Sequence, residues 1–183
     1  MKNIVRIILP LFIFAMMVSC ESVESIFDVE FETTLSGDLN IQVEEPAGMK
    51  AAEGIPFSAS DTLNPADDEE IEKYMEKIVS IEADSIVAVV DWVSKEGVVF
   101  LPGTTVTISD GNTEVGWTIM NDWSINKDDV VKLENVENLY NAVSDILDRM
   151  VEFTVSITGE CNQSGVSILI RIEIGTTVKA NPL

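Results

Sequence analysis

The sequence predicts a mainly β protein, an antiparallel β-sandwich with two short helices at about 64–78 and 135–150. Most of the chain alternates apolar and polar residues, which is the period of a strand with one buried and one solvated face. Strands buried on both faces of a parallel sheet have continuous apolar runs instead, so the alternation favours antiparallel sheets. The two segments with helical periodicity are expected to cover edges or ends of the sandwich.

The first folded part of the chain is expected to contain a β-hairpin. Two runs of alternating apolar and polar residues flank the sequence Ser36-Gly37-Asp38, whose residue types are typical of turns. The solvated side of these runs is largely acidic. The pattern predicts strands at 27–34, 39–44 and 57–63, a turn at 36–38 and a loop at 45–55.

Two apolar stripes predict the helices. Asn64 is a favourable N-cap and Pro65 suits the first helical position, while the acidic residues at 67–70 match the positive end of the helix dipole. Helical spacing then connects Ile71, Tyr74, Met75 and Ile78. The second helix has an apolar face made of Val136, Leu139, Tyr140, Val143, Leu147 and Met150.

The remaining segments return to the strand period. Alternation predicts strands at 80–92, 98–101, 104–109 and around 115–119, with a turn at Asp110-Gly111-Asn112. The chain is expected to close with a long hairpin, whose strands at 151–157 and 166–174 flank a turn at 161–165.

The first twenty residues resemble a bacterial lipoprotein signal. Lys2 and Arg6 form a positive start, residues 7–18 are apolar, and Met17-Val18-Ser19-Cys20 follows. In such signals cleavage precedes the cysteine, whose sulfur carries diacylglycerol and whose amine is acylated with palmitate. We therefore expect a signal peptide at 1–19, lipidation at Cys20, an acidic tether at 20–25 and one β-sandwich domain at 26–183.

Two alternatives to lipidation stay open from the sequence. An ordinary signal peptide also ends on small residues and could be cleaved near Cys20. Cys161 is the other cysteine, and an exported chain with an even number of cysteines could pair Cys20 with Cys161.

The charge of the chain excludes one class of partner. It has 11 Lys plus Arg against 32 Asp plus Glu, for a net charge of −21. A field of this sign repels phosphate backbones and anionic lipid headgroups, so we expect no nucleic-acid partner and attachment to the membrane through the lipid alone. Solubility at a crowded surface accounts for the acidity, and a cationic partner is the alternative.

Residues suited to catalysis or cofactor binding are scarce. The chain has no histidine, which removes the commonest general base and metal ligand. We expect no catalytic residues, no metal and no cofactor. The alternative is a calcium ion at Asp110, Asn112 and Glu114, whose oxygen-bearing side chains alternate along the chain. Among so many acidic residues, a pair could also support a carboxylate-dependent hydrolase.

The tryptophans are the candidates for ligand binding, because sugars stack on aromatic faces. Trp92 and Trp117 are in phase with apolar neighbours, which favours core packing. Trp123 lies among Asn121, Asp122 and Ser124, so we expect it to be exposed and to be the ligand-binding aromatic if there is one.

The whole chain resembles small surface lipoproteins of the Bacteroidota. The resemblance rests on the lipobox, on Glu21 and Glu24 behind the cysteine, on the opening strand Phe27-Asp28-Val29-Glu30-Phe31-Glu32-Thr33-Thr34 and on the closing Val178-Lys179-Ala180-Asn181-Pro182-Leu183. It implies export, a lipid anchor in the outer membrane and display at the cell surface. It implies no functional residues.

Together these observations suggest a non-enzymatic accessory or protein-interaction module, held at the membrane by its N-terminal lipid and recruiting a protein partner at the cell surface. A binding module for an apolar or carbohydrate ligand is the first alternative, and the carboxylate-dependent hydrolase is the second.

Overall fold

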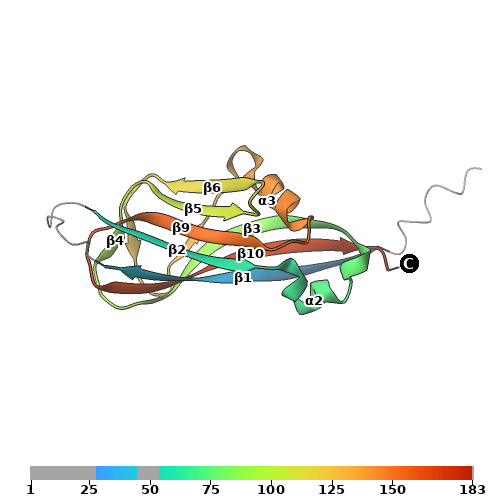
Figure 1. The fold of residues 1–183 in the computed structure, drawn as a ribbon, viewed down its shortest axis with the longest axis horizontal. Helices are drawn as coiled ribbons and strands as arrows, with labels where there is room; N and C mark the ends of the chain where they lie inside the picture. The colour runs from blue at the N-terminus through green and yellow to red at the C-terminus, as the bar shows by residue number, and fades with distance from the viewer. Residues whose placement is uncertain (1–27, 45–53, 183) are drawn as a thin grey trace, which may run out of the picture.

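Two antiparallel β-sheets pack face to face in the computed structural model, which describes residues 28–44 and 54–182. The sandwich is elongated, and short helices lie at one end and along one side (Figure 1). This confirms the predicted fold class. The predicted signal peptide and tether, Cys20, and residues 45–53 of the predicted loop lie outside the described residues.

The first sheet, sheet A, has the strand order β1-β10-β3-β8. β1 (Val29–Val43) and β10 (Val166–Ala180) pair along their whole lengths, from Val29 opposite Ala180 to Val43 opposite Val166. On the other side of β10 lies β3 (Ile78–Val93), whose outer edge pairs in part with the short β8 (Val130–Lys132).

The second sheet, sheet B, is built around β9 (Phe153–Cys161). β2 (Ile55–Leu63) pairs with one edge of β9 over its full length. The other edge pairs with β5 (Thr104–Ser109) and, at its end, with β4 (Val98–Phe100). The sheet is completed by β6 (Glu114–Ile119) beside β5 and by β7 (Trp123–Ile125) beside β4.

The hairpin predicted at 27–44 is wrong, because residues 29–43 form the single strand β1. The alternation keeps the same phase through Ser36-Gly37-Asp38: Leu35 before it and Leu39 after it are both buried. Gly37 therefore occupies an inward position of the strand, where a Cβ atom would lie 2.9 Å from Cγ2 of Val155. The glycine is needed for close packing between the sheets and not for a turn.

The predicted closing hairpin is also wrong. Both strands exist, but β9 belongs to sheet B and β10 to sheet A, so the segment between them crosses from one sheet to the other. Asn162 holds this crossing, since its backbone N–H donates to the carbonyl oxygen of Val99 and its side chain donates to that of Gly97. Alternation identifies a strand, but it does not identify the strand's neighbour.

The helix predicted at 64–78 is broken into three turns: η2 (Pro65–Asp67), α2 (Glu69–Glu72) and η3 (Met75–Lys77). Asn64 caps the first turn, as predicted. Asp68 ends that turn and caps the next, accepting hydrogen bonds from the backbone of Glu70 and Ile71 at 3.0 Å. Two caps four residues apart divide one predicted helix into short pieces.

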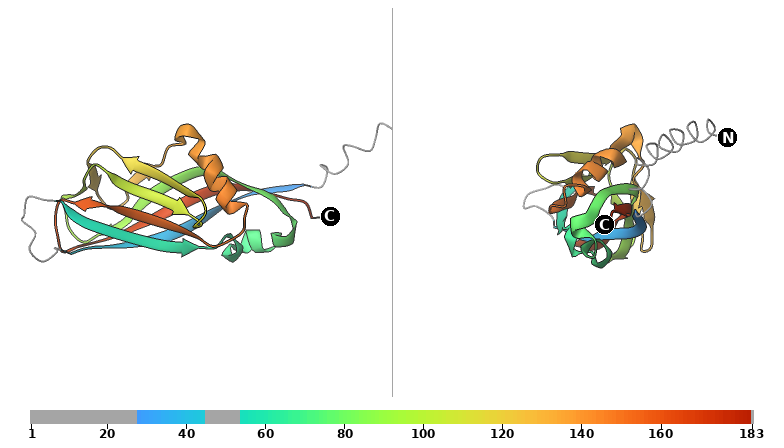
Figure 2. Two further views of the ribbon diagram at one scale, coloured as in Figure 1. Left: turned by 45° about the horizontal axis from the view of Figure 1, so that its top comes forward. Right: turned by 90° about the vertical axis from the view of Figure 1, so that its right-hand side faces the viewer.

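The second helix consists of η4 (Val136–Asn138) and α3 (Leu139–Leu147), so its existence is confirmed but its start is later. Glu137 and Asn138 have φ angles of +53° and +63°, which are not helical and separate the two pieces. α3 then buries Tyr140, Val143, Ile146 and Leu147 against the sandwich. Figure 2 shows it beside the end of β5.

Side chains of α3 and of Asp148, which follows it, cover the β3 edge between Ile81 and Ile86, just before the residues that pair with β8. Three backbone N–H groups of β3 donate to these side chains. Ile81 donates to the Asp148 carboxylate (2.6 Å), Ala83 to the Ser144 hydroxyl (2.9 Å) and Ile86 to the Tyr140 hydroxyl (3.3 Å). The Tyr140 hydroxyl in turn donates to the carbonyl oxygen of Leu133 at 2.6 Å. An edge covered in this way offers no template for a further strand.

Replacing Tyr140 by Phe should lower the free energy of unfolding by about 1–3 kcal/mol, because a buried N–H and a buried carbonyl would lose their partner. Urea denaturation monitored by circular dichroism measures this. Tyr74→Phe is the control, since the Tyr74 hydroxyl has no hydrogen bond to any described residue, and it should be close to neutral. Equal stability of the two variants would contradict the capping role.

Candidate functional site

Trp123 is buried, so the prediction of an exposed aromatic at this position is wrong. It is 7% exposed and begins β7, where it pairs with Phe100 of β4. The Trp123 and Phe100 rings meet edge to face at 5.5 Å, and Phe57 stacks on Phe100 at 4.2 Å. The polar residues before Trp123 hid a short Trp-Ser-Ile alternation, which was the available signal. Trp123 offers no free face for a sugar.

Trp92 is the exposed tryptophan, at 49%, so its predicted place in the core is also wrong. The cause is a β-bulge. Leu169 of β10 pairs with Trp92 but Ile170 pairs with Val90, so Asp91 is an extra residue in β3. One extra residue moves the following side chain to the opposite face of the sheet. Trp117 is buried as predicted, and its indole N–H donates to the carbonyl oxygen of Glu134 at 2.9 Å.

Trp92 belongs to an apolar surface on the outer face of sheet A. We call Trp92, Leu169, Val89 and Val130 the Trp92 patch. Their place follows from the register: Leu169 pairs with Trp92, and Val89 pairs with Val130. Val130 is 61% exposed. On β1, Asn40 lies opposite Leu169 and places an exposed amide in line with Leu169 and Trp92 across the three strands.

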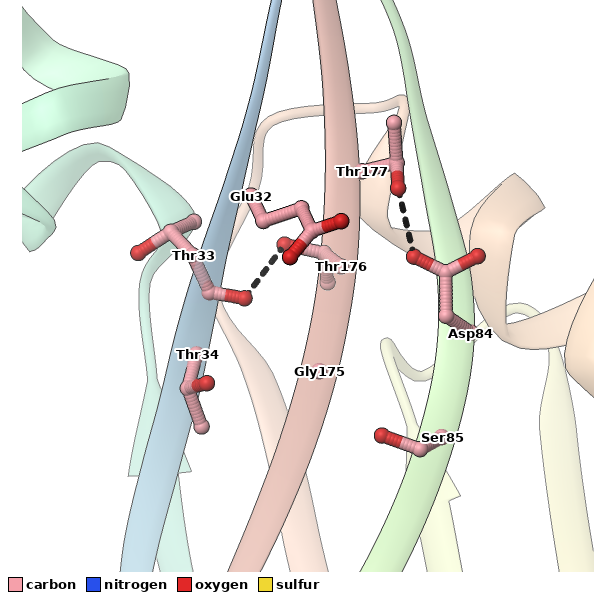
Figure 3. A pocket seen from close by; sticks show the side chains of 8 residues that line it. All are labelled: Glu32, Thr33, Thr34, Asp84, Ser85, Gly175, Thr176 and Thr177. Carbon is pink, nitrogen blue, oxygen red and sulfur yellow. Dashed lines mark hydrogen bonds between the residues drawn. The ribbon is translucent and has the colours of Figure 1, made fainter.

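The same outer face has a polar hollow of about 590 Å³ nearer the ends of β1 and β10 where Val29 meets Ala180 (Figure 3). Gly175 forms its floor, and a Cβ there would lie 2.5 Å from the Ser85 hydroxyl. Figure 3 shows Glu32 and Asp84 on the strands that flank β10. Thr177 donates a hydrogen bond of 2.6 Å to Asp84. We call this the Gly175 hollow.

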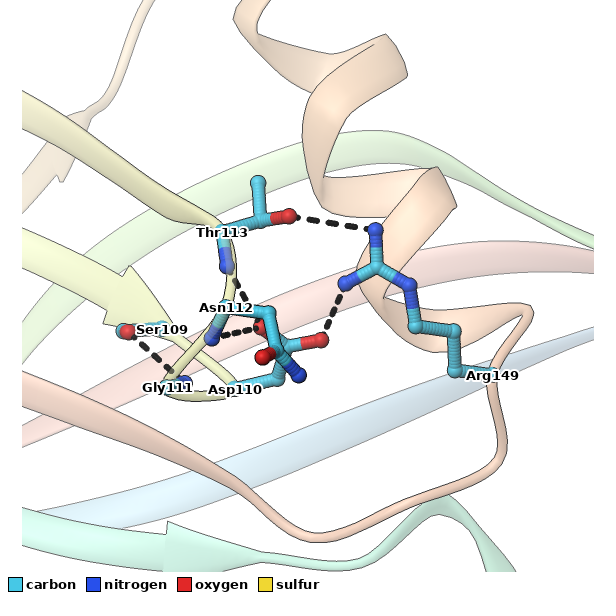
Figure 4. A network of polar contacts seen from close by, with 6 residues as sticks. All are labelled: Ser109, Asp110, Gly111, Asn112, Thr113 and Arg149. Atoms are coloured by element: carbon cyan, nitrogen blue, oxygen red, sulfur yellow. Dashed lines mark hydrogen bonds and ion pairs between the residues drawn. The ribbon is translucent and has the colours of Figure 1, made fainter.

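Asp110 occupies the β5–β6 turn as predicted, and the structure pairs it with Arg149 after α3 (Figure 4). One carboxylate oxygen accepts hydrogen bonds from the backbone of Asn112 (2.9 Å) and Thr113 (2.7 Å). The other contacts the guanidinium of Arg149, which also donates to the Thr113 hydroxyl at 3.1 Å. The arrangement fastens the end of α3 to sheet B.

These contacts explain the acidity of Asp110. Backbone N–H groups of Thr113 and Asn112, aided by Arg149, lower its pKa from 3.8 to about 2. A general acid of a glycosidase requires the opposite shift, a raised pKa.

Among residues 28–44 and 54–182, no group of three or more His, Cys, Asp or Glu side chains is placed to hold a metal ion. Of the calcium candidates, the structure gives Asp110 a guanidinium partner and places Glu114 at the start of β6.

Cys161 is a buried free thiol at the end of β9, and burial raises its pKa. Its predicted position in a turn is therefore corrected to the last residue of a strand. Within the described part of the chain, no helix is both long and apolar enough to cross a membrane.

No family model and no curated protein matches the chain. The solved structures that are similar to it include two at low sequence identity. One is the decameric BFDV capsid protein, at 9% identity and a TM-score of 0.42, covering 82% of this chain and 99% of that one. The other is from Desmodium yellow mottle tymovirus, at 10% identity and a TM-score of 0.33, covering 85% and 89% of the two chains.

The placement of the tryptophans predicts how acrylamide quenches their fluorescence. Trp92→Phe should lower the quenching constant of the protein, because it removes the exposed indole. Trp123→Phe should raise the average constant, because it removes a shielded one. The reverse order would contradict the bulge at Asp91.

Proposed function

We propose that this chain is a non-enzymatic protein-interaction module, lipid-anchored at the outer membrane and displayed at the cell surface. The observation that carries the interaction role is the Trp92 patch. An exposed tryptophan is costly to leave in water. By register Trp92 lies beside Leu169 and near Val89 and Val130, with the Asp91–Arg171 ion pair and Asn40 next to these residues. Apolar surface with a polar rim is typical of interaction sites. Tryptophan is also among the residues that contribute most to binding energy at protein interfaces.

The position of the patch supports a partner other than the membrane. The chain enters sheet A at Val29, which lies opposite Ala180, whereas Trp92 lies opposite Leu169. Eleven residues of β10 separate these two levels, which is about 36 Å along an extended strand. The patch is therefore far along the domain from the residue where the tether joins it.

A carbohydrate-binding module is the second candidate, with Trp92 in place of the buried Trp123. Its support is the composition of the row beside Trp92: the exposed Asn40 amide, and the Gln42 amide that accepts a 2.6 Å hydrogen bond from the Ser167 hydroxyl. An aromatic face next to amides and hydroxyls suits a sugar ring, which stacks on the one and hydrogen-bonds to the others.

The lipid anchor predicts a specific mass. The N-terminal peptide of the mature protein should begin at Cys20 and carry a diacylglycerol and an acyl chain, whereas Cys20→Ser should lack both and leave the membrane fraction. Cys161→Ala, which keeps Cys20, should retain the lipid. Mass spectrometry of the purified proteins checks this. An unmodified peptide that begins elsewhere would contradict lipidation and favour an ordinary signal peptide.

The interaction role is tested by affinity capture of the lipidated protein from its own membrane, followed by titration of the captured protein. A stoichiometric partner is expected, and Trp92→Ala should weaken its binding by about 2 kcal/mol or more, roughly thirtyfold. Met120→Ala is the matched control, because Met120 is 74% exposed but follows β6 of sheet B.

Repeated failure to capture any stoichiometric partner would count against the interaction role. A fluorescence shift on titrating glycans, abolished in Trp92→Ala, would instead support the carbohydrate-binding candidate.

A further inference from the structure

The outer face of sheet A has an excess of negative charge. Its basic side chains are already engaged: Arg171 contacts Asp91 at 3.0 Å and Glu173 at 2.9 Å, and Lys179 contacts Glu82 at 2.9 Å. Lys132 lies 3.8 Å from Glu134. The acidic side chains on the outward positions of the long strands are Glu30, Glu32, Asp38, Glu82, Asp84, Asp91 and Glu173. The face therefore attracts cations.

The Gly175 hollow is the part of this face best suited to hold a cationic group. Glu32 and Asp84 form no ion pair with any described residue. One oxygen of Asp84 is held by Thr177 at 2.6 Å, which fixes the direction of the carboxylate. Gly175 has no side chain, and the Ser85 hydroxyl lies over it, so small groups line the hollow between the two acids. An ammonium or guanidinium group has several donors and no acceptor, which matches this lining.

The hollow and the Trp92 patch lie on one surface. Gly175 and Leu169 are both on β10, six residues apart, which is about 20 Å along the strand. A protein interface of standard size buries about 800 Å² on each partner, so one partner can cover both features.

We propose that the outer face of sheet A docks a protein whose surface has an apolar contact for Trp92 and, about 20 Å away, a Lys or Arg side chain that enters the Gly175 hollow. This rests on the proposed interaction role and adds the docking face and the charge of the partner. Charge complementarity selects this occupant, since a second copy of the chain and an anionic lipid surface both have the wrong sign.

The test uses the lipidated full chain in its own membrane and three variants. Glu32→Gln/Asp84→Asn removes the two charges of the hollow and keeps the shape of the side chains. Trp92→Ala removes the apolar contact. Glu114→Gln/Glu152→Gln is the matched control, because both glutamates are exposed, lie away from sheet A and form no ion pair with the described residues.

A water-soluble carbodiimide joins carboxylates to lysine amines in direct contact, and 1,2-cyclohexanedione followed by mass spectrometry shows which arginines of the captured protein are shielded. The expected result is an adduct at Glu32 or Asp84, or a shielded partner arginine, with affinity reduced about tenfold or more in Glu32→Gln/Asp84→Asn and unchanged in the control. Binding should also weaken as salt rises from about 0.05 M to about 0.5 M.

A captured partner that binds both double variants equally would overturn the docking face and leave the interaction role intact. Failure to capture any partner would overturn both. A concentration-dependent dimer in sedimentation that is abolished in Trp92→Ala would overturn the proposed partner, because it would show that the face binds a second copy of the chain. A glycan that shifts Trp92 fluorescence and competes with the captured protein for this face would also overturn the proposed protein partner, because it would show that the face binds a carbohydrate.

Discussion

The pairing of β10 with both β1 and β3 is the constraint on which the rest of the structure depends. All fifteen residues of β10 pair with β1, and its alternate side chains point into the core. Sheet B packs on the surface that these residues and their neighbours provide. Because side chains alternate along a strand, a slip of one residue along β10 would expose this whole apolar row and bury its charged one. The register of one strand therefore decides what is core and what is surface.

Acidic side chains have structural roles beyond keeping the protein soluble. Asp61, Asp68, Asp110 and Asp148 each accept a hydrogen bond from backbone N–H groups at a strand edge, a helix start or a turn. Asp61 protects the β1 edge at Asp38 and Asp148 protects the β3 edge at Ile81. A carboxylate forms stronger hydrogen bonds to N–H groups than a neutral acceptor does. Part of the negative charge is thus needed by the fold. On the outer face of sheet A, Asp91, Glu173 and Glu82 are paired with basic side chains, whereas Glu32 and Asp84 form no ion pair with any described residue.

The sequence was sufficient to predict the class of fold, most of the strands and the two helical regions, because each depends on local periodicity. It was insufficient wherever the outcome depended on a neighbour. Gly37 looks like a turn residue until the close approach of Val155 explains it. β9 and β10 look like a hairpin until their partners are known. The buried and exposed positions of two tryptophans were predicted the wrong way round for the same reason. Trp92 is turned outward by a bulge at Asp91, and Trp123 is buried because β4 pairs with it.

Three bulges in β3 place an extra residue opposite β10, at Val79, Asp84 and Asp91. Val79 is exposed, Asp84 lines the Gly175 hollow, and the bulge at Asp91 turns Trp92 outward. What this face presents is therefore determined by backbone register as much as by the choice of side chains. Deleting a single codon in β3 would remove or relocate one of these exposed side chains while the buried row of β10 stays the same. Such a face can acquire new specificity through short insertions and deletions, a route that substitutions in a packed core do not offer.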